Sequence, residues 1–78
     1  MEQKEELTIN IQLSALALKL RRFRKERGET IEQTAASIGT RPSKLLKWET
    51  DKELPSLEHI AMLAAHFGIS KEELVSIE

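Results

Sequence analysis

Hydrophobic residues recur along most of this chain at helical rather than strand spacing. From residue 14 onward the apolar positions follow one another at intervals of three, four or seven, which places side chains on one face of an α-helix. Glycine and proline interrupt this pattern at short intervals, so no segment is long. These interruptions are Gly28, Gly39, Pro42, Pro55 and Gly68. We therefore predict an all-α domain of five short helices.

The first two predicted helices cover residues 14–27 and 31–38. Gly28 suits the left-handed residue that often follows a helix. Thr30 and Gln33 have the spacing of a capping box, in which the threonine hydroxyl accepts from the backbone and the glutamine side chain reaches back. The residues expected to face the core are Leu16, Leu20, Phe23, Ala35 and Ile38.

The remaining three helices are predicted at residues 42–50, 57–67 and 71–76. Serines stand at the N-cap position of the last two helices. Ser70 and Glu73 repeat the capping-box spacing. The residues expected to face the core are Leu45, Trp48, Leu57, Ile60, Leu63, Ala64, Phe67 and Leu74.

The N-terminal segment allows two interpretations. Residues 8–13 alternate polar and apolar side chains, which favours a strand or an extended arm. Ile9 and Leu13 also continue the helical spacing of the segment that follows, so the first helix can begin earlier. A lone strand is not stable, so an arm would pair with the same segment of a second chain. We favour an arm, a candidate dimerisation strand, at 1–13 and one domain at 14–78.

The net charge of −1 conceals a strong segregation of charge along the chain. Residues 19–47 contain nine basic and three acidic residues, a net charge of +6, whereas the flanking segments carry −2 and −5. A basic surface on an otherwise acidic protein attracts phosphate. Charge alone is equally consistent with a solvated helix face. The basic residues are Lys19, Arg21, Arg22, Arg24, Lys25, Arg27, Arg41, Lys44 and Lys47.

A short turn containing Gly39 separates the helices predicted at 31–38 and 42–50. This arrangement defines a helix-turn-helix, whose second helix is held clear of the body and can enter a major groove. Several features then fall in register: LRRFRKERG, Ala35, Gly39, Leu45, Trp48-Glu49, Pro55-Ser56, Leu63-Ala64, Phe67-Gly68 and Leu74. With these features, residues 16–75 resemble the Cro/C1-type (Xre family) helix-turn-helix regulators. The resemblance implies a five-helix, lambda-repressor-like fold and a DNA-binding transcriptional regulator, with repression as the expected output.

Three positions depart from the family pattern. Ile31 stands where the family usually has a phosphate-binding glutamine, and Thr34 where it usually has leucine. Arg41 stands where a serine or threonine commonly caps the third helix. These departures concern phosphate binding more than the fold.

The resemblance also implies roles for individual residues. It assigns base contacts to Pro42, Ser43, Lys44, Leu46 and Lys47, and phosphate contacts to Thr30, Ile31, Arg41, Thr50 and Lys52. From its chemistry, Lys44 favours a phosphate contact, as Arg41 does. It implies that Arg24 and Glu49 form a partly buried, structural ion pair. Lysine can reach guanine O6 and N7, and serine can bond at a base edge. Leu46 either touches a thymine methyl group, packs into the core or is simply exposed.

Other functional classes find little support in the sequence. There is no cysteine for a disulfide, a thiolate metal site or a nucleophile. His59 and His66 lie seven residues apart, which is not the i, i+3 or i, i+4 spacing of a helical metal pair. We expect no enzymatic activity, no metal and no cofactor, in a soluble cytoplasmic homodimer that binds double-stranded DNA and no membrane. The alternative is a protein-interaction module on the same fold, such as an antitoxin or a phage accessory protein.

Overall fold

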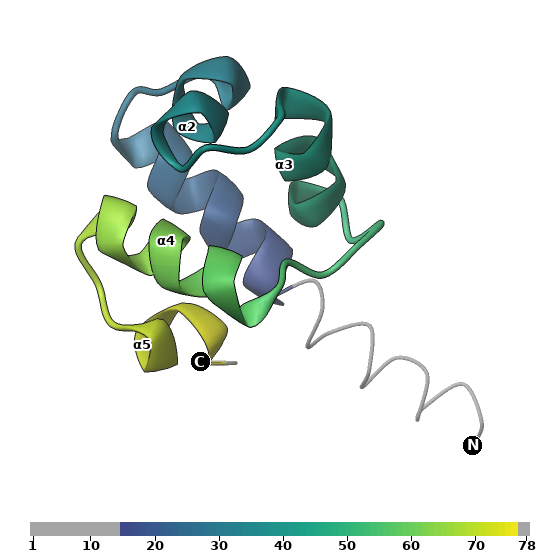
Figure 1. Cartoon of the computed structure of the whole chain (residues 1–78). Helices are drawn as coiled ribbons and strands as arrows, with labels where there is room; N and C mark the ends of the chain where they lie inside the picture. The colour runs from purple at the N-terminus through teal and green to yellow at the C-terminus, as the bar shows by residue number, and fades with distance from the viewer. Residues whose placement is uncertain (1–14, 77–78) are drawn as a thin grey trace.

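The computed structural model describes residues 15–76, and within them it is all-helical. A helix at residues 15–26, called the first helix below, precedes α2 (Ile31–Ser37), α3 (Pro42–Glu49), α4 (Leu57–Phe67) and α5 (Lys71–Val75). Figure 1 shows the helices arranged around a common centre, with α2 and α3 at one end and α5 at the other. The predicted all-α fold is confirmed. The proposed arm at 1–13, and with it the domain boundary, lies outside the described residues.

The predicted ends of four helices were one residue too long. Arg27 lies in the turn that follows the first helix. Ile38, Thr50 and Ser76 are the C-cap residues of α2, α3 and α5 and lie outside the helices. A hydrophobic or polar residue in the cap position does not interrupt the sequence pattern, so periodicity alone could not exclude it. Gly68, by contrast, ends α4 in the left-handed region at φ 75°, where glycine has no steric penalty.

Side chains begin α2, α4 and α5 in the predicted manner. The Thr30 hydroxyl accepts from the Gln33 backbone, and the Gln33 side chain accepts from the Thr30 backbone at 2.8 Å, a complete capping box. Ser56 accepts from the backbone N–H of His59. Ser70 accepts from the Glu73 backbone. The structure shows no return bond from the Glu73 side chain, so only half of this second box forms.

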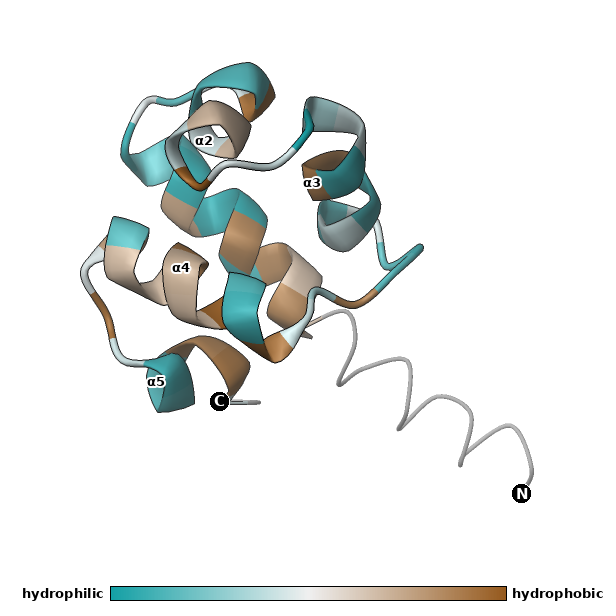
Figure 2. Ribbon diagram, viewed as in Figure 1, coloured by the Kyte–Doolittle hydropathy of each residue, from teal (hydrophilic) through white to brown (hydrophobic). Residues whose placement is uncertain are grey.

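The core lies where the helices meet, and Figure 2 shows their apolar faces turned toward it. Its buried members are Leu20, Ala35, Ile38, Leu45, Trp48, Ile60, Leu63, Ala64, Phe67 and Leu74, with Leu16 and Phe23 packed against it. Leu57 was predicted to belong to this set, but its side chain is 83% exposed. It is the first residue of α4, and helical side chains point toward the N-terminus. Leu57 therefore projects beyond the packed part of the helix.

Polar groups also connect distant segments. The ammonium group of Lys19 is buried and donates to the backbone carbonyls of Glu73, at 3.0 Å, and Ser76. Lys19 thus fixes the end of α5 and does not belong to the basic surface predicted from the sequence.

No helix within residues 15–76 has the length and apolar character needed to cross a membrane.

A second polar connection centres on Glu29, in the turn before α2. Its carboxylate accepts from the Thr34 hydroxyl at 2.5 Å and lies 2.8 Å from the His66 ring. Arg27 lies 3.2 Å from the same carboxylate. Thr34, one of the departures from the family pattern, is fully buried, so its hydroxyl needs this partner. The turn is therefore joined to both α2 and α4.

Candidate nucleic-acid interface

The connection between α2 and α3 brings the two helices together and leaves one side of α3 open. Gly39 turns the chain at φ 74°, and the backbone of Thr40 donates to the Ala35 carbonyl at 2.9 Å. Leu45 and Trp48 anchor α3 in the core. The opposite side is exposed to solvent and carries Pro42, Ser43, Lys44, Leu46 and Lys47. All five predicted base-contacting residues therefore lie on the open side of the helix.

Leu46 is 51% exposed. Of the interpretations left open by the sequence, the core position is therefore excluded. An apolar side chain that remains in solvent on an otherwise polar helix side is available for contact with a partner such as a thymine methyl group.

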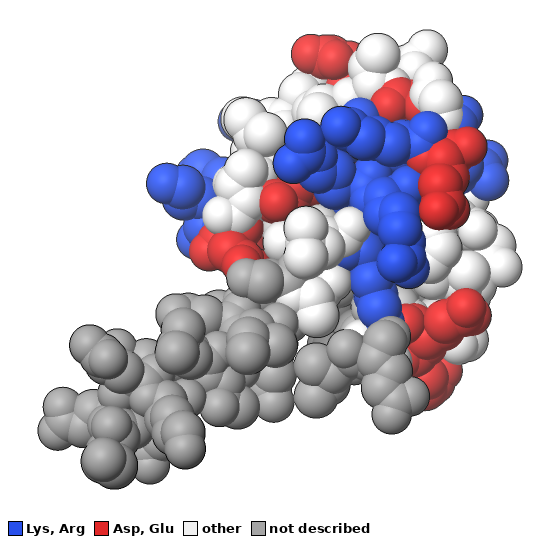
Figure 3. Space-filling model, turned by 180° about the vertical axis from the view of Figure 1, so that it is seen from behind, with Lys and Arg blue, Asp and Glu red and all other residues white. Residues whose placement is uncertain are grey.

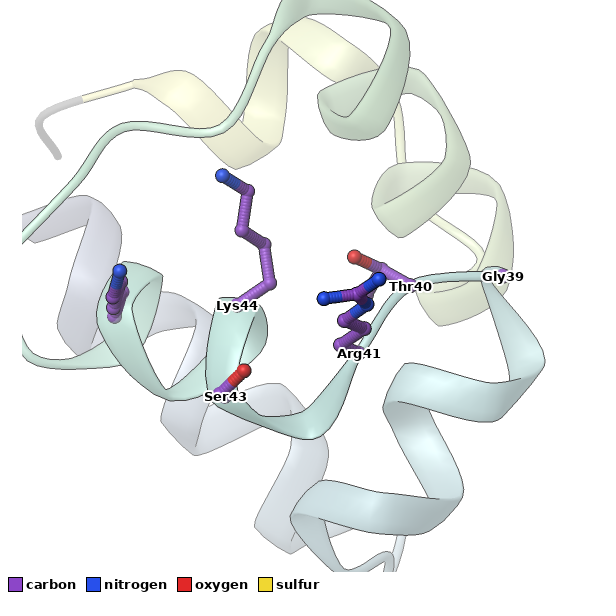
Figure 4. Close-up of a pocket in the computed structure, with 6 residues that line it drawn as sticks. Gly39, Thr40, Arg41, Ser43 and Lys44 are labelled. Carbon is purple, nitrogen blue, oxygen red and sulfur yellow. The ribbon is translucent and has the colours of Figure 1, made fainter.

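A basic pocket of about 590 Å³ lies beside the start of α3. It is lined by Gly39, Thr40, Arg41, Ser43, Lys44 and Lys47. Figure 4 shows the Arg41 and Lys44 side chains extending to the same side of the chain, with Ser43 next to the base of Lys44. Three cations and two hydroxyls in one concavity form a suitable environment for an anion.

The three cations of this pocket differ in their partners. The ammonium group of Lys44 lies 2.7 Å from the carboxylate of Glu53, in the loop after α3. This hydrogen bond lowers the pKa of Glu53. Arg41 is the N-cap residue of α3, but its side chain makes no capping bond. Within the described residues, the side chains of Arg41 and Lys47 make no hydrogen bond or ion pair, although the charge of Lys47 also helps to lower the pKa of Glu53. Both side chains can therefore bind a ligand without breaking a hydrogen bond.

The predicted phosphate-contacting residues are exposed, except Ile31, which is partly buried. The capping box occupies the backbone N–H of Thr30, and its hydroxyl oxygen already accepts from Gln33. The Thr50 hydroxyl donates to the Leu46 carbonyl at 2.7 Å, as does the Thr50 backbone at 3.0 Å. Thr50 would have to break one of these bonds before it could donate to phosphate. Lys52 is exposed, and its side chain has no partner among the described residues.

A smaller hollow of about 270 Å³ lies at the other edge of the open side of α3. Its lining comes from the first helix, α2 and the end of α3: Arg21, Arg24, Ile31, Leu46, Glu49 and Thr50. Arg21 was not among the predicted contact residues. Its position three residues before Arg24, on the same helix face, is the signal that could have identified it.

Arg24 and Glu49 join the first helix to the end of α3. The Nε and Nη2 atoms of Arg24 donate to the two carboxylate oxygens of Glu49 at 2.7 and 3.1 Å, and Nη1 donates to the Glu29 carbonyl at 2.8 Å. The hydrogen bonds with Glu49 raise the pKa of Arg24. All three nitrogen atoms of the guanidinium group therefore donate within the protein.

The two histidines have separate partners. The Nδ1 atom of His59 lies 2.9 Å from the Ser56 hydroxyl, and its ring packs against Trp48 with centroids 5.0 Å apart. His66 bonds to Glu29 at the other end of α4. Within residues 15–76, no three His, Cys, Asp or Glu side chains lie close enough together to hold a metal ion.

Comparison with known proteins agrees with this geometry. Residues 18–77 match the family described as helix-turn-helix domain. The chain belongs to the helix-turn-helix family. No curated protein sequence matches it. Two crystal structures of the clp gene regulator ClgR from Corynebacterium glutamicum are similar to this helix-turn-helix chain. In both comparisons the sequence identity is 26%, and the similarity covers 82% of the present chain. Their TM-scores are 0.75 and 0.72, and the similarity covers 68% and 83% of the ClgR chains, respectively.

Most of the described cations of this helix-turn-helix protein fall into two groups. Those engaged within the described residues are Lys19, Arg22, Arg24, Arg27 and Lys44. Those around α3 without a partner there are Arg21, Arg41, Lys47 and Lys52. Lys and Arg side chains also gather on the face turned away from the viewer in Figure 1, with acidic side chains at the edges of the cluster (Figure 3). Positive charge is therefore concentrated on part of the surface, although the chain as a whole carries a net charge of −1.

Proposed function

We propose that this protein is a sequence-specific regulator of transcription that inserts α3 into the major groove of double-stranded DNA and has no enzymatic activity or cofactor. One observation carries the proposal. The inner side of α3 is fixed by Leu45 and Trp48, while its outer side presents Ser43 and Lys47 to solvent. The similarity to ClgR, whose structures are named for a gene regulator, supports the same conclusion. The resemblance of this chain to Cro/C1-type regulators favours repression.

In this proposal, the side chains at the centre of the open side read base edges. Lys47 donates to guanine O6 and N7, and Ser43, one turn earlier, donates to or accepts from a neighbouring base. Leu46 contacts a thymine methyl group. Pro42, at the first position of α3, has no N–H and brings the start of the helix close to the bases.

The flanking groups bind phosphate and set the depth and register of α3. Arg41 and Lys44 line the basic pocket and contact one strand, and Lys44 exchanges Glu53 for a phosphate oxygen. Lys52 adds a contact from the loop. At the start of α2, the Thr30 hydroxyl and the backbone N–H of Ile31 complete the set.

The regulator acts as a homodimer in this proposal. A single inserted helix reads about four or five base pairs, which gives too little specificity alone. Two copies of α3 about 34 Å apart would match successive turns of a palindromic site. The interface is formed either by the N-terminal segment or by the surface of α4 and α5. Measuring the mass in solution of a variant without residues 1–13 separates these choices, because a persistent dimer eliminates the arm.

The dependence of duplex binding on salt tests the proposal. Fluorescence anisotropy with a labelled duplex, at salt concentrations from about 50 to 200 mM, gives the slope of log affinity against log salt. We expect tight binding at low salt and a slope steeper than about −2 for each chain, since each phosphate contact contributes roughly −0.9. Absence of duplex binding at low salt would reject the DNA-binding function and favour a protein partner.

A further inference from the structure

Unpaired positive charge lies at both edges of the open side of α3. Arg41 and Lys47 line the basic pocket at one edge, and Arg21 lines the smaller hollow at the other. Lys44 borders the basic pocket, and Leu46 borders the smaller hollow. Because successive residues of an α-helix are rotated by about 100°, these two side chains lie roughly 160° apart around the helix axis. The two concavities therefore lie on different sides of the helix, one at each edge of its open face.

The smaller hollow contains one cation that is not already used. All the bonds of the Arg24 guanidinium described above go to Glu49 and to the Glu29 carbonyl. Both Glu49 oxygens accept from Arg24, so this carboxylate is compensated. Arg21, in contrast, is exposed and has no hydrogen-bond or ion-pair partner among residues 15–76.

The other residues of the hollow do not compete for an anion. Ile31 and Leu46 have no polar side-chain atoms, and the Thr50 hydroxyl donates to the Leu46 carbonyl. Of the two described cations that line this hollow, Arg21 is therefore the one whose charge is not already paired with a carboxylate. A guanidinium group binds phosphate oxygens in a bidentate geometry that lysine cannot reproduce.

We propose that Arg21 binds a phosphate on the DNA strand opposite to the one held by Arg41 and Lys44. This inference rests on the proposed insertion of α3 into the groove. A major groove is about 12 Å wide, close to the diameter of an α-helix with its side chains, and its two walls are the two phosphate backbones. Cations at opposite edges of α3 therefore meet opposite strands. Arg21 therefore adds a phosphate contact to the second strand, whereas the sequence predicted only the contacts on the side of Arg41 and Lys44.

Duplex binding by Arg21→Ala, measured on a duplex that the protein prefers and on a scrambled one, tests the contact. We expect both affinities to fall by a similar factor of about tenfold, and the salt slope to become shallower by about 1. Arg21→Lys should restore the slope but not the full affinity. Arg22→Ala is the matched control, because this exposed arginine of the same helix does not line the hollow. It should keep the affinity within a few-fold, and thermal unfolding should show that each variant remains folded.

Ethylation of single phosphates locates the contact. Within each half-site, binding of the unmodified protein should be sensitive to ethylation at sites on both strands. Arg21→Ala should lose the sensitivity on one strand of each half-site and Arg41→Ala on the other strand of the same half-site. An Arg21→Ala variant with unchanged salt slope and ethylation pattern, or one that loses the same sites as Arg41→Ala, would overturn the inference while leaving DNA binding itself intact. A wild-type protein that binds no duplex would instead reject the proposed function.

Discussion

The guanidinium of Arg24 and the carboxylate of Glu49 form a two-pronged ion pair, with Nε 2.7 Å from Oε2, between the first helix and the last residue of α3. The two side chains are only 11% and 3% exposed. The pair lies directly behind the open side of α3 and fixes the helix that we propose reads the DNA. We therefore propose that the pair stabilises the fold and does not contact DNA.

Replacing Glu49 should destabilise the fold. Glu49→Ala leaves the Arg24 guanidinium buried and uncompensated, a change that costs about 3–5 kcal/mol. Thermal unfolding followed by circular dichroism should show a markedly lower Tm. Glu58→Ala, which removes an exposed carboxylate from α4, should leave the Tm nearly unchanged. Equal transitions for Glu49→Ala and the wild type would rule out the structural role of the pair.

Lys19 should contribute to stability rather than to DNA affinity. Its buried ammonium group donates to the Glu73 and Ser76 carbonyls, and hydrogen bonds from a charged group contribute about 1.5–3 kcal/mol. Lys19→Met keeps the apolar stem and removes the charge. We expect a lower midpoint in denaturant titration but, at temperatures where the variant is folded, an unchanged salt slope for duplex binding. A shallower slope with unaltered stability would place Lys19 on the DNA surface instead.

The Glu29 cluster predicts a loss of stability in acid. Hydrogen bonding to His66, then to Thr34 and Arg27, lowers the pKa of Glu29 from its ordinary value of 4.5 to about 2. Because the pKa is lower in the folded state, the stabilisation is fully present above pH 4.5 and is lost as the pH falls toward 2. Glu29→Gln should be less stable at neutral pH, and the difference from wild type should shrink over this range. Denaturant midpoints at several pH values measure it, and a difference independent of pH would contradict the assignment.

Glu53 should lower the affinity of the protein for duplex DNA. Its carboxylate pairs with Lys44 at 2.7 Å and places a negative charge beside the proposed phosphate pocket. Glu53→Gln releases Lys44 and removes the repulsion, so duplex affinity should rise by a few-fold at low salt. Glu58→Gln again serves as the control. A weaker complex in Glu53→Gln would mean that the carboxylate positions Lys44 for binding instead of competing for it.

The sequence predicted the helices and most of the core because both follow from local periodicity and capping. Thr30, Ser56 and Ser70 mark helix starts by their own side chains, and Leu45 and Trp48 repeat at the spacing of a buried face. Leu57 continued that spacing but is exposed. The spacing of hydrophobic residues does not show which end of a helix extends beyond the core.

Contacts between distant segments were harder to predict. Lys19 looked like part of a basic face because its partners are backbone carbonyls more than fifty residues away. Arg21 was missed because its significance depends on the hollow that it forms with Ile31 and Leu46, which belong to other helices. The sequence therefore predicted the exposed side of α3 but not the second cation-lined edge beside it.

Selection of duplexes from a random pool, followed by affinity measurements with Lys47→Ala, tests most directly whether α3 reads DNA. We predict a symmetric consensus site, and a loss of binding free energy for the variant of about 1–3 kcal/mol on that site, with a much smaller loss on a scrambled duplex. Recovery of no consensus, or equal binding of both duplexes by wild type and variant, would contradict it.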